Sequence, residues 1–262
     1  MKLGQRQWTR DELLLAVNLY CKLPFGRMNS RNSDITALAV LLQRTPGSVA
    51  LKLCNFASLD ASLPRTGMTN VSQLDRQIWG EFCADWNDMA FESERLLAQA
   101  RHITLEEVAG TAEADDTEPT PAGRVKEQLI KARVNQQFFR QAVLAAYDNT
   151  CCVTGLRQPD LLVAGHIKPW SVDAANRLNP RNGLALNSLH DRAFELGLFT
   201  VRPEDYVIEV SSALRAVQAE NPSMISLLLG CDAKPLRLPA RKRFLPDPAF
   251  LDWHRTTRFQ RR

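Results

Sequence analysis

Residues 161–170 of the chain read LLVAGHIKPW. The run is apolar up to His166, and Pro169 removes a backbone hydrogen-bond donor soon after it, so we expect a strand that ends near the histidine. A Pro-Arg-Asn-Gly turn leads into Leu184–Leu186, a second short apolar run. The two runs together predict an antiparallel hairpin with a polar loop between its strands.

A helix is expected directly after this hairpin. Asn187 and Ser188 belong to the residue types that cap helix N-termini. They place His190 and Asp191 in or near the first helical turn, where the partial positive charge of the helix favours an anion such as a phosphate. The predicted order of strand, loop, strand and helix therefore brings two histidines to either side of an Asn-Gly loop.

These residues match the chemistry of phosphodiester hydrolysis. The reaction needs a base that deprotonates water, a cation that absorbs negative charge, and groups that hold both in line. His166 is suited to be the base, because the unperturbed pKa of imidazole lies near neutrality. Asn182 is the expected loop-holding residue, since an amide both donates and accepts hydrogen bonds, and Asn179 is the alternative. His190 is the expected metal ligand.

The segment from Phe138 to Val201 closely resembles the HNH endonucleases of the restriction-enzyme-like group. The resemblance is carried by FFR at 138–140, YDNTC at 147–151, HIKPW at 166–170, NGLAL at 182–186 and HDRAFE at 190–195, and PDPAFLDWH at 246–254 is similar to that group's tail. It implies a ββα-metal fold in which His166 activates water, Asn182 steadies the loop and His190 binds a divalent ion.

One position departs from the family pattern. Many HNH enzymes carry Asp or His immediately before the base as a second metal ligand, and this chain has Gly165 there. Another carboxylate is then needed: we favour Asp191, with Glu195 behind it and Asp160 as a further alternative.

The expected cofactor is a single Mg²⁺ or Mn²⁺ ion, because oxygen ligands with one imidazole suit these metals. No structural zinc is expected, since the helix start lacks the paired cysteines of a zinc knuckle.

Basic residues near the motif predict contacts with DNA phosphates. The candidates are Lys168, Arg177, Arg181 and Arg192. The net charge of the chain is +4, and Lys and Arg outnumber Asp and Glu after residue 124. A polyanionic partner for this part of the chain, DNA, is consistent with that distribution.

The segment from Trp8 to Leu59 resembles a Myb/SANT-like three-helix module, with a Trp-Thr start and an Arg-Thr-Pro turn. If its third helix faces DNA, Lys52 and Asn55 are the expected contacts. Lys52 is the only charged residue of that helix, and a single positive charge gives little affinity for DNA phosphates. The alternative is a module that binds a protein partner or forms a homodimer.

We therefore predict an α+β protein. An all-α, helix-turn-helix-like domain spans residues 1–102, an acidic linker spans 103–123, and an HNH domain spans 124–262. The chain shows no signal segment and no apolar run long enough for a membrane span, so we expect a soluble, cytoplasmic protein.

The predicted activity is divalent-metal-dependent hydrolysis of DNA phosphodiester bonds, and the resemblance implies a role in restriction or defence. Two alternatives stay open. One is a catalytically weak or inactive DNA-binding or regulatory protein that retains the HNH scaffold, and the other is a nuclease recruited by a protein partner through its helical domain.

Overall fold

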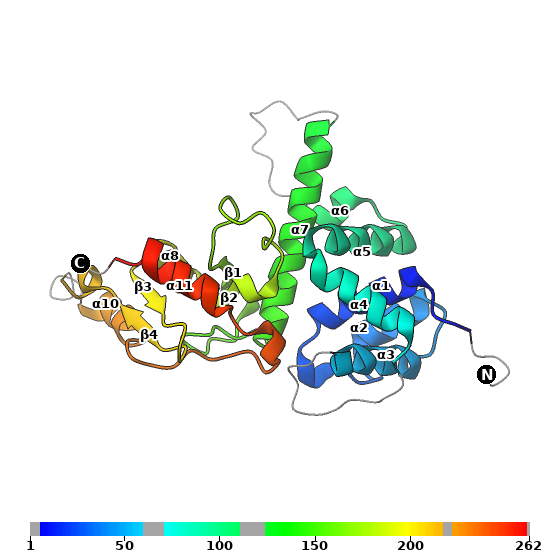
Figure 1. Ribbon diagram of the computed structural model, residues 1–262, viewed down its shortest axis with the longest axis horizontal. Coiled ribbons are helices and arrows are strands. Elements are labelled where there is room, and N and C mark those ends of the chain that lie inside the picture. Colours follow the sequence, from blue (N-terminus) through cyan, green and yellow to red (C-terminus); the bar gives the residue numbers. More distant parts are fainter. Residues whose placement is uncertain (1–5, 60–70, 111–123, 217–221, 261–262) are drawn as a thin grey trace. The chain divides into compact units, whose positions relative to one another are not determined.

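The computed structural model describes residues 6–59, 71–110, 124–216 and 222–260. The fold is α+β, as predicted from the sequence, and its contacts divide into two compact units (Figure 1). We call residues 1–141 the helical unit and residues 142–262 the hairpin unit. No helix within the described segments combines the length and apolar character that a membrane span requires.

The helical unit is built from α-helices that follow the apolar periodicity of the sequence. They are α1 (Arg10–Lys22), α2 (Ser33–Leu41), α3 (Pro46–Leu59), α4 (Gln73–Ala84), α5 (Trp86–Arg101), α6 (Leu105–Ala109) and most of α7 (Arg124–Ala146), with a short 3-10 turn at Phe25–Arg27. Aromatic side chains fill its core: the ring of Tyr20 lies 6.4 Å from that of Phe56 and 5.3 Å from that of Trp79. Such pairs stabilise a core beyond their buried area.

The division between the units falls inside α7, later in the chain than the acidic segment at which we placed the boundary. Phe138 of α7 packs on Phe82 of α4, with ring centroids 6.0 Å apart. Lys131 of α7 also pairs with Asp88 of α5 at 2.9 Å. These contacts attach most of α7 to the helical unit.

The predicted linker, residues 103–123, contains a short helix. Thr104 and Glu107 form a capping box at the start of α6: the Thr104 hydroxyl accepts from the Glu107 amide at 3.1 Å, and the Glu107 carboxylate accepts from the Thr104 amide at 2.6 Å. Acidic residues are favourable at a helix N-terminus. Glu106 and Glu107, which belong to the predicted acidic linker, therefore stabilise the first turn of α6. The rest of the predicted linker, 111–123, lies outside the described residues.

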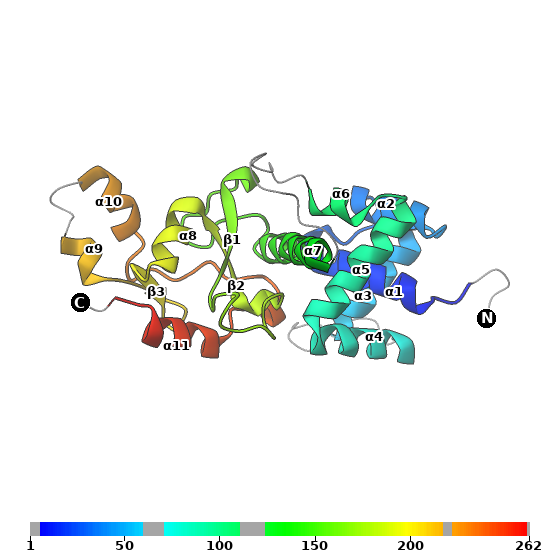
Figure 2. The same ribbon diagram turned by 90° about the horizontal axis from the view of Figure 1, so that it is seen from above.

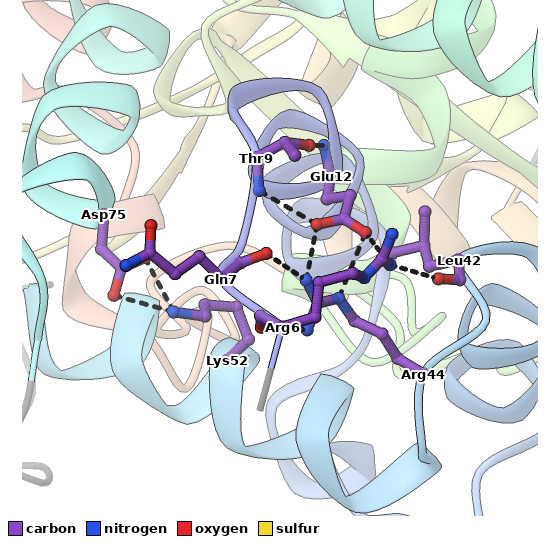
Figure 3. Close-up of polar contacts among 8 residues, drawn as sticks. All are labelled: Arg6, Gln7, Thr9, Glu12, Leu42, Arg44, Lys52 and Asp75. Atoms are coloured by element: carbon purple, nitrogen blue, oxygen red, sulfur yellow. Dashed lines mark hydrogen bonds and ion pairs between the residues drawn. The ribbon is translucent and has the colours of Figure 1, made fainter. Parts of the chain in front are cut away.

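Lys52 and Asn55, the suggested DNA contacts of α3, are both buried. The Lys52 ammonium donates to both carboxylate oxygens of Asp75, at 2.9 and 3.0 Å (Figure 3). The Asn55 amide nitrogen lies 3.5 Å from the same carboxylate. Lys52 is 8% exposed and Asp75 is 0% exposed. The expectation that these side chains face DNA is therefore corrected: burial of an unpaired charge is costly, and they join α3 to α4 instead.

A second polar cluster ties the segment before α1 to the turn between α2 and α3. The Arg44 guanidinium donates to the Glu12 carboxylate at 2.7 Å and to the Gln7 carbonyl at 2.7 Å (Figure 3). It also lies 4.1 Å from the Trp8 ring. Burial raises the pKa of Glu12, but hydrogen bonds from Arg44 and Thr9 outweigh it and hold the pKa below its ordinary value. The Trp-Thr start and the Arg-Thr-Pro turn thus meet in one contact.

We expect Lys52→Met to lower the free energy of unfolding of the helical unit by about 3–5 kcal/mol, because it leaves the buried Asp75 charge without its partner. The matched control is Lys126→Met, which removes a half-exposed pair with Glu106 and should cost less than about 1 kcal/mol. Urea unfolding of the full chain measures both. Equal effects of the two substitutions would contradict the structural role of Lys52.

The hairpin unit has the strand, loop, strand and helix order that the sequence predicted. β1 (Leu162–His166) pairs antiparallel with β2 (Gly183–Asn187), with His166 opposite Gly183, and α8 (Ser188–Glu195) packs on both strands (Figure 2). The other elements are β3 (Phe199–Val201), β4 (Ile208–Val210), α9 (Ser212–Ala216), α10 (Pro222–Leu229) and α11 (Pro248–Thr257), with 3-10 turns at Pro159–Leu161, Pro180–Asn182 and Lys242–Phe244. β3 and β4 form a second antiparallel pair.

Two buried cysteines support the hairpin from beneath. The Cys151 sulfur accepts from the Asn187 amide at 3.4 Å, and the Cys152 amide donates to the Ala185 carbonyl at 2.7 Å. Burial raises the pKa of the Cys152 thiol well above its usual value, so the thiol stays protonated. Both residues therefore act as packing groups under β2.

Candidate active site

A cavity of about 460 Å³ opens in the hairpin unit beside the end of β1. β1 and the loop after it, one face of α8 and the last residues of α11 line the cavity. The lining side chains that bear on chemistry are His166, Trp170, Asp191, Glu195, His254 and Arg258. Three of them, His166, Asp191 and Glu195, are site residues expected from the sequence.

His166 is held in one tautomer by the loop. Its Nε2 lies 2.9 Å from the carbonyl oxygen of Arg177, and because a carbonyl can only accept, Nε2 carries the proton. The lone pair of the neutral ring is then on Nδ1. Burial lowers the pKa of His166 below its ordinary value, and the hydrogen bond to Arg177 opposes this in part. The ring is therefore neutral at pH 7, the state that a general base requires.

Asn182 fastens both sides of the loop that follows His166. Its side-chain oxygen accepts from the Lys168 amide at 2.8 Å, while its side-chain nitrogen donates to the carbonyls of Lys168 at 3.1 Å and Asn176 at 3.2 Å. The residue is 0% exposed. Asn179, the alternative, caps the 3-10 turn Pro180–Asn182 by accepting from the Arg181 amide at 3.1 Å. Asn182 thus makes the loop contacts expected of the orienting asparagine.

The carboxylate of Asp191 occupies the space where a side chain at position 165 would lie. A Cβ atom on Gly165 would overlap Oδ1 of Asp191 and would also touch Leu186. Only a glycine therefore lets this carboxylate approach β1. Burial raises the pKa of Asp191, the charge of Glu195 raises it further, and Arg192 opposes both. A half-buried carboxylate beside a second one is an environment that favours a bound cation.

The structure does not bring His190 to this cavity. Its Nδ1 lies 3.0 Å from the side-chain oxygen of Asn187, which also accepts from the His190 amide at 2.9 Å. The residue is 2% exposed. Burial lowers the pKa of His190 below its ordinary value, and a hydrogen bond with the backbone of Leu227 opposes this in part. Within the described segments, no group of three or more His, Cys, Asp or Glu side chains has the spacing of a metal site.

The four cations expected to bind phosphate lie around the hairpin, but the described lining of the cavity includes none of them. They are Lys168, Arg177, Arg181 and Arg192. Their partners are, in the same order, the Asp173 carboxylate (3.1 Å), the Trp170 carbonyl (2.8 Å), the Asp247 carboxylate (3.0 Å) and the Glu195 carboxylate (2.7 Å). A phosphate would therefore compete with these contacts.

His254 is a structural histidine at the back of the cavity. Its two ring nitrogens lie 2.9 Å from the Thr200 hydroxyl and 3.0 Å from the Phe194 carbonyl, and the ring stacks on Phe194 at 3.7 Å. Burial lowers the pKa of His254 to about 4. Because both nitrogens are used and the ring stays neutral, His254 joins α11 to α8 and β3.

We expect the hairpin unit to lose stability as the pH falls from about 6.5 to about 4, the ordinary and folded pKa values of His254. The unfolded chain binds the proton more tightly than the folded chain. The contribution of neutral His254 to the free energy of unfolding is therefore complete above pH 6.5, and about 3 kcal/mol of it is lost as the pH falls to about 4. Thermal unfolding against pH measures the loss. His254→Gln should flatten the plot of melting temperature against pH. An unchanged slope in this variant would show that other groups cause the loss of stability.

Arg258 and Trp170 line the cavity without having been recognised in the sequence as site residues. Arg258 lies far along the chain from the histidine motif, and nothing in its local pattern marks it. Only the docking of α11 beside α8 brings it there. Trp170 follows the motif directly, and its ring lies 5.7 Å from that of His166.

Residues 151–202 match the HNH endonuclease family. A search of curated proteins found no match to the chain. The matched segment runs from Cys151 beneath the hairpin through β1, β2 and α8 into β3, and it contains His166, Asn182 and His190. The match to this family supports nuclease activity in general, for this segment of the chain. The chain thus contains, at residues 151–202, a segment that is similar to the HNH endonuclease family.

Proposed function

We propose that the protein is a divalent-metal-dependent endonuclease that hydrolyses DNA phosphodiester bonds, with the restriction or defence role that the resemblance implies. The observation that carries the proposal is the shared cavity of His166 and Asp191, which come from the strand and the helix of one ββα unit. A nitrogen base and a carboxylate that line one cavity match the two requirements of hydrolysis, a proton acceptor and a group that binds a cation.

His166 takes the proton of the attacking water in this proposal. Nδ1 accepts it, while the other proton stays on Nε2 and is donated to the Arg177 carbonyl, which stabilises the positive ring that forms. Asn182 acts as a positioning residue, because its three hydrogen bonds hold the main chain at Lys168 and at Asn176, the residue before Arg177. The loop thus keeps the base in one orientation during the reaction.

Asp191 is the proposed metal ligand, with Glu195 beside it. Carboxylate oxygens suit Mg²⁺ and Mn²⁺, and a bound cation would oppose the burial and the Glu195 charge that raise the pKa of Asp191. A divalent ion bound there would neutralise charge on the phosphate. His190 lies outside the cavity lining, so we assign it to the start of α8 through Asn187.

The proposal is tested with supercoiled plasmid DNA. We expect cleavage by the full chain with Mg²⁺ or Mn²⁺, complete loss after chelation with EDTA, and recovery when the ion is restored. Cleavage that persists in EDTA would contradict the metal requirement. Absence of cleavage with either ion would favour the alternative of an inactive DNA-binding protein that retains the scaffold.

The second candidate function is a nuclease that a protein partner recruits through the helical unit. The surface of this unit suits a protein partner better than DNA. Lys52, the only charge on α3, is buried against Asp75, while Val40 of α2 and Leu51 of α3 are 74% and 45% exposed. Exposed apolar side chains are a feature of protein interfaces. In the full chain, Val40→Ser with Leu51→Ser should leave DNA affinity unchanged, and a loss of affinity would contradict the assignment.

A further inference from the structure

Arg258 gives the cavity its permanent positive charge. The charged side chains of the described lining are those of Asp191, Glu195 and Arg258, since His254 is neutral and buried. A phosphodiester that enters meets two negative carboxylates on α8. It needs positive charge near these carboxylates as well as any bound cation, and Arg258, directly after α11, supplies it.

The main chain around Arg258 is held in place by backbone contacts. Its amide donates to the His254 carbonyl at 2.9 Å, and the Gln260 amide donates to the Gly197 carbonyl at 2.9 Å. Gly197 has a φ of 69°, and a Cβ atom there would overlap the carbonyl oxygen of Arg258. The turn between α8 and β3 therefore fixes residue 258 through backbone atoms alone, beside the helix that carries Asp191.

The side chain of Arg258, in contrast, is exposed and makes no hydrogen bond or ion pair within the described segments. Arg255, one turn earlier on α11, is paired with Glu209 at 3.2 Å and with Glu204 at 3.8 Å. The charge of Arg258 still reaches the back of the cavity, because it lowers the pKa of His254. Arg258 is thus an anchored cation whose guanidinium is available to a ligand.

We propose that Arg258 binds the DNA backbone in the cavity by donating to the non-bridging oxygens of a phosphate. The planar guanidinium presents two parallel donors that match two phosphate oxygens, and the fixed backbone lowers the entropy lost on binding. The inference rests on the proposed nuclease function. It adds the residue that holds the substrate phosphate in the cavity that Asp191 and Glu195 also line.

The test measures binding of uncut duplex DNA in EDTA, with His166→Ala in every protein so that chemistry does not intervene. Adding Arg258→Gln should weaken binding at least about tenfold and make the slope of log affinity against log salt shallower by about 0.9, as expected for one lost phosphate contact. Arg258→Lys should retain the salt slope. The matched control is Arg255→Gln, which removes the same charge from the same helix outside the cavity and should change neither quantity substantially.

Equal affinity and slope for Arg258→Gln and Arg255→Gln would overturn the proposal. A melting temperature that is lower for Arg258→Gln than for Arg255→Gln would also overturn it. That result would show that the Arg258 side chain stabilises the fold. Failure of the nuclease proposal is a separate result: it shows as wild-type cleavage by His166→Ala or as no metal-dependent cleavage at all, while the binding comparison in EDTA still measures Arg258.

Discussion

His166→Ala is expected to reduce the rate of metal-dependent DNA cleavage by about 10²–10⁴-fold, the usual contribution of a general base. The reason is local: the neutral ring carries its proton on Nε2 against the Arg177 carbonyl, and alanine provides neither the basic Nδ1 nor this contact. Single-turnover cleavage of plasmid DNA with excess enzyme isolates the chemical step.

Two controls make the His166 result specific. His102 is an exposed histidine of the helical unit with a left-handed backbone, so His102→Asn, which suits that conformation, should cleave at the wild-type rate. Binding of uncut DNA should be unchanged in His166→Ala, since the base is needed in the transition state. Cleavage by His166→Ala at a rate close to that of the wild type would place the base elsewhere.

Gly165→Ala is expected to slow cleavage by about 10²-fold, although it adds a single methyl group. That methyl would overlap the Asp191 carboxylate and displace it from β1, and displacements of about 1 Å at a reacting centre have effects of this size. Asp191→Asn should be at least as severe, because it removes the charge that would hold the cation. Plasmid cleavage at several Mn²⁺ concentrations measures both.

The double variant distinguishes a shared mechanism from two separate defects. If Gly165→Ala acts by moving Asp191, adding Asp191→Asn should give little further loss, since residues that act through one group are not additive. Gly80→Ala is the matched control: a Cβ on Gly80 in α4 meets nothing within 4 Å and should leave cleavage unchanged. Multiplication of the two single effects in the double variant would contradict the proposed contact.

The hairpin was predictable because its evidence is local. An apolar run ending at His166, an Asn-Gly turn, a second apolar run and the helix-capping residue Asn187 follow each other in sequence, and the structure has β1, β2 and α8 in that order. The loop contacts of Asn182 were predictable for the same reason: an amide beside a tight turn has few other partners than the loop backbone.

Features that depend on contacts between distant segments were not predictable. Lys52 looked like a surface cation of α3, but its partner Asp75 is on α4, and the pair is buried. Gly165 looked like the loss of a ligand, whereas it makes room for a carboxylate from α8. Arg258 reaches the cavity because α11 docks beside α8 and because its main chain lies close to Gly197. Each case was decided by packing rather than by sequence pattern.

The most direct test of the account is a crystal structure of the protein soaked with Mn²⁺, with the ion located by its anomalous scattering. We expect one ion in the cavity within about 2.1 Å of an Asp191 carboxylate oxygen, on the same side as His166. An ion bound through Nε2 of His190 with Asp191 unliganded, or no ion in the cavity at saturating Mn²⁺, would contradict it.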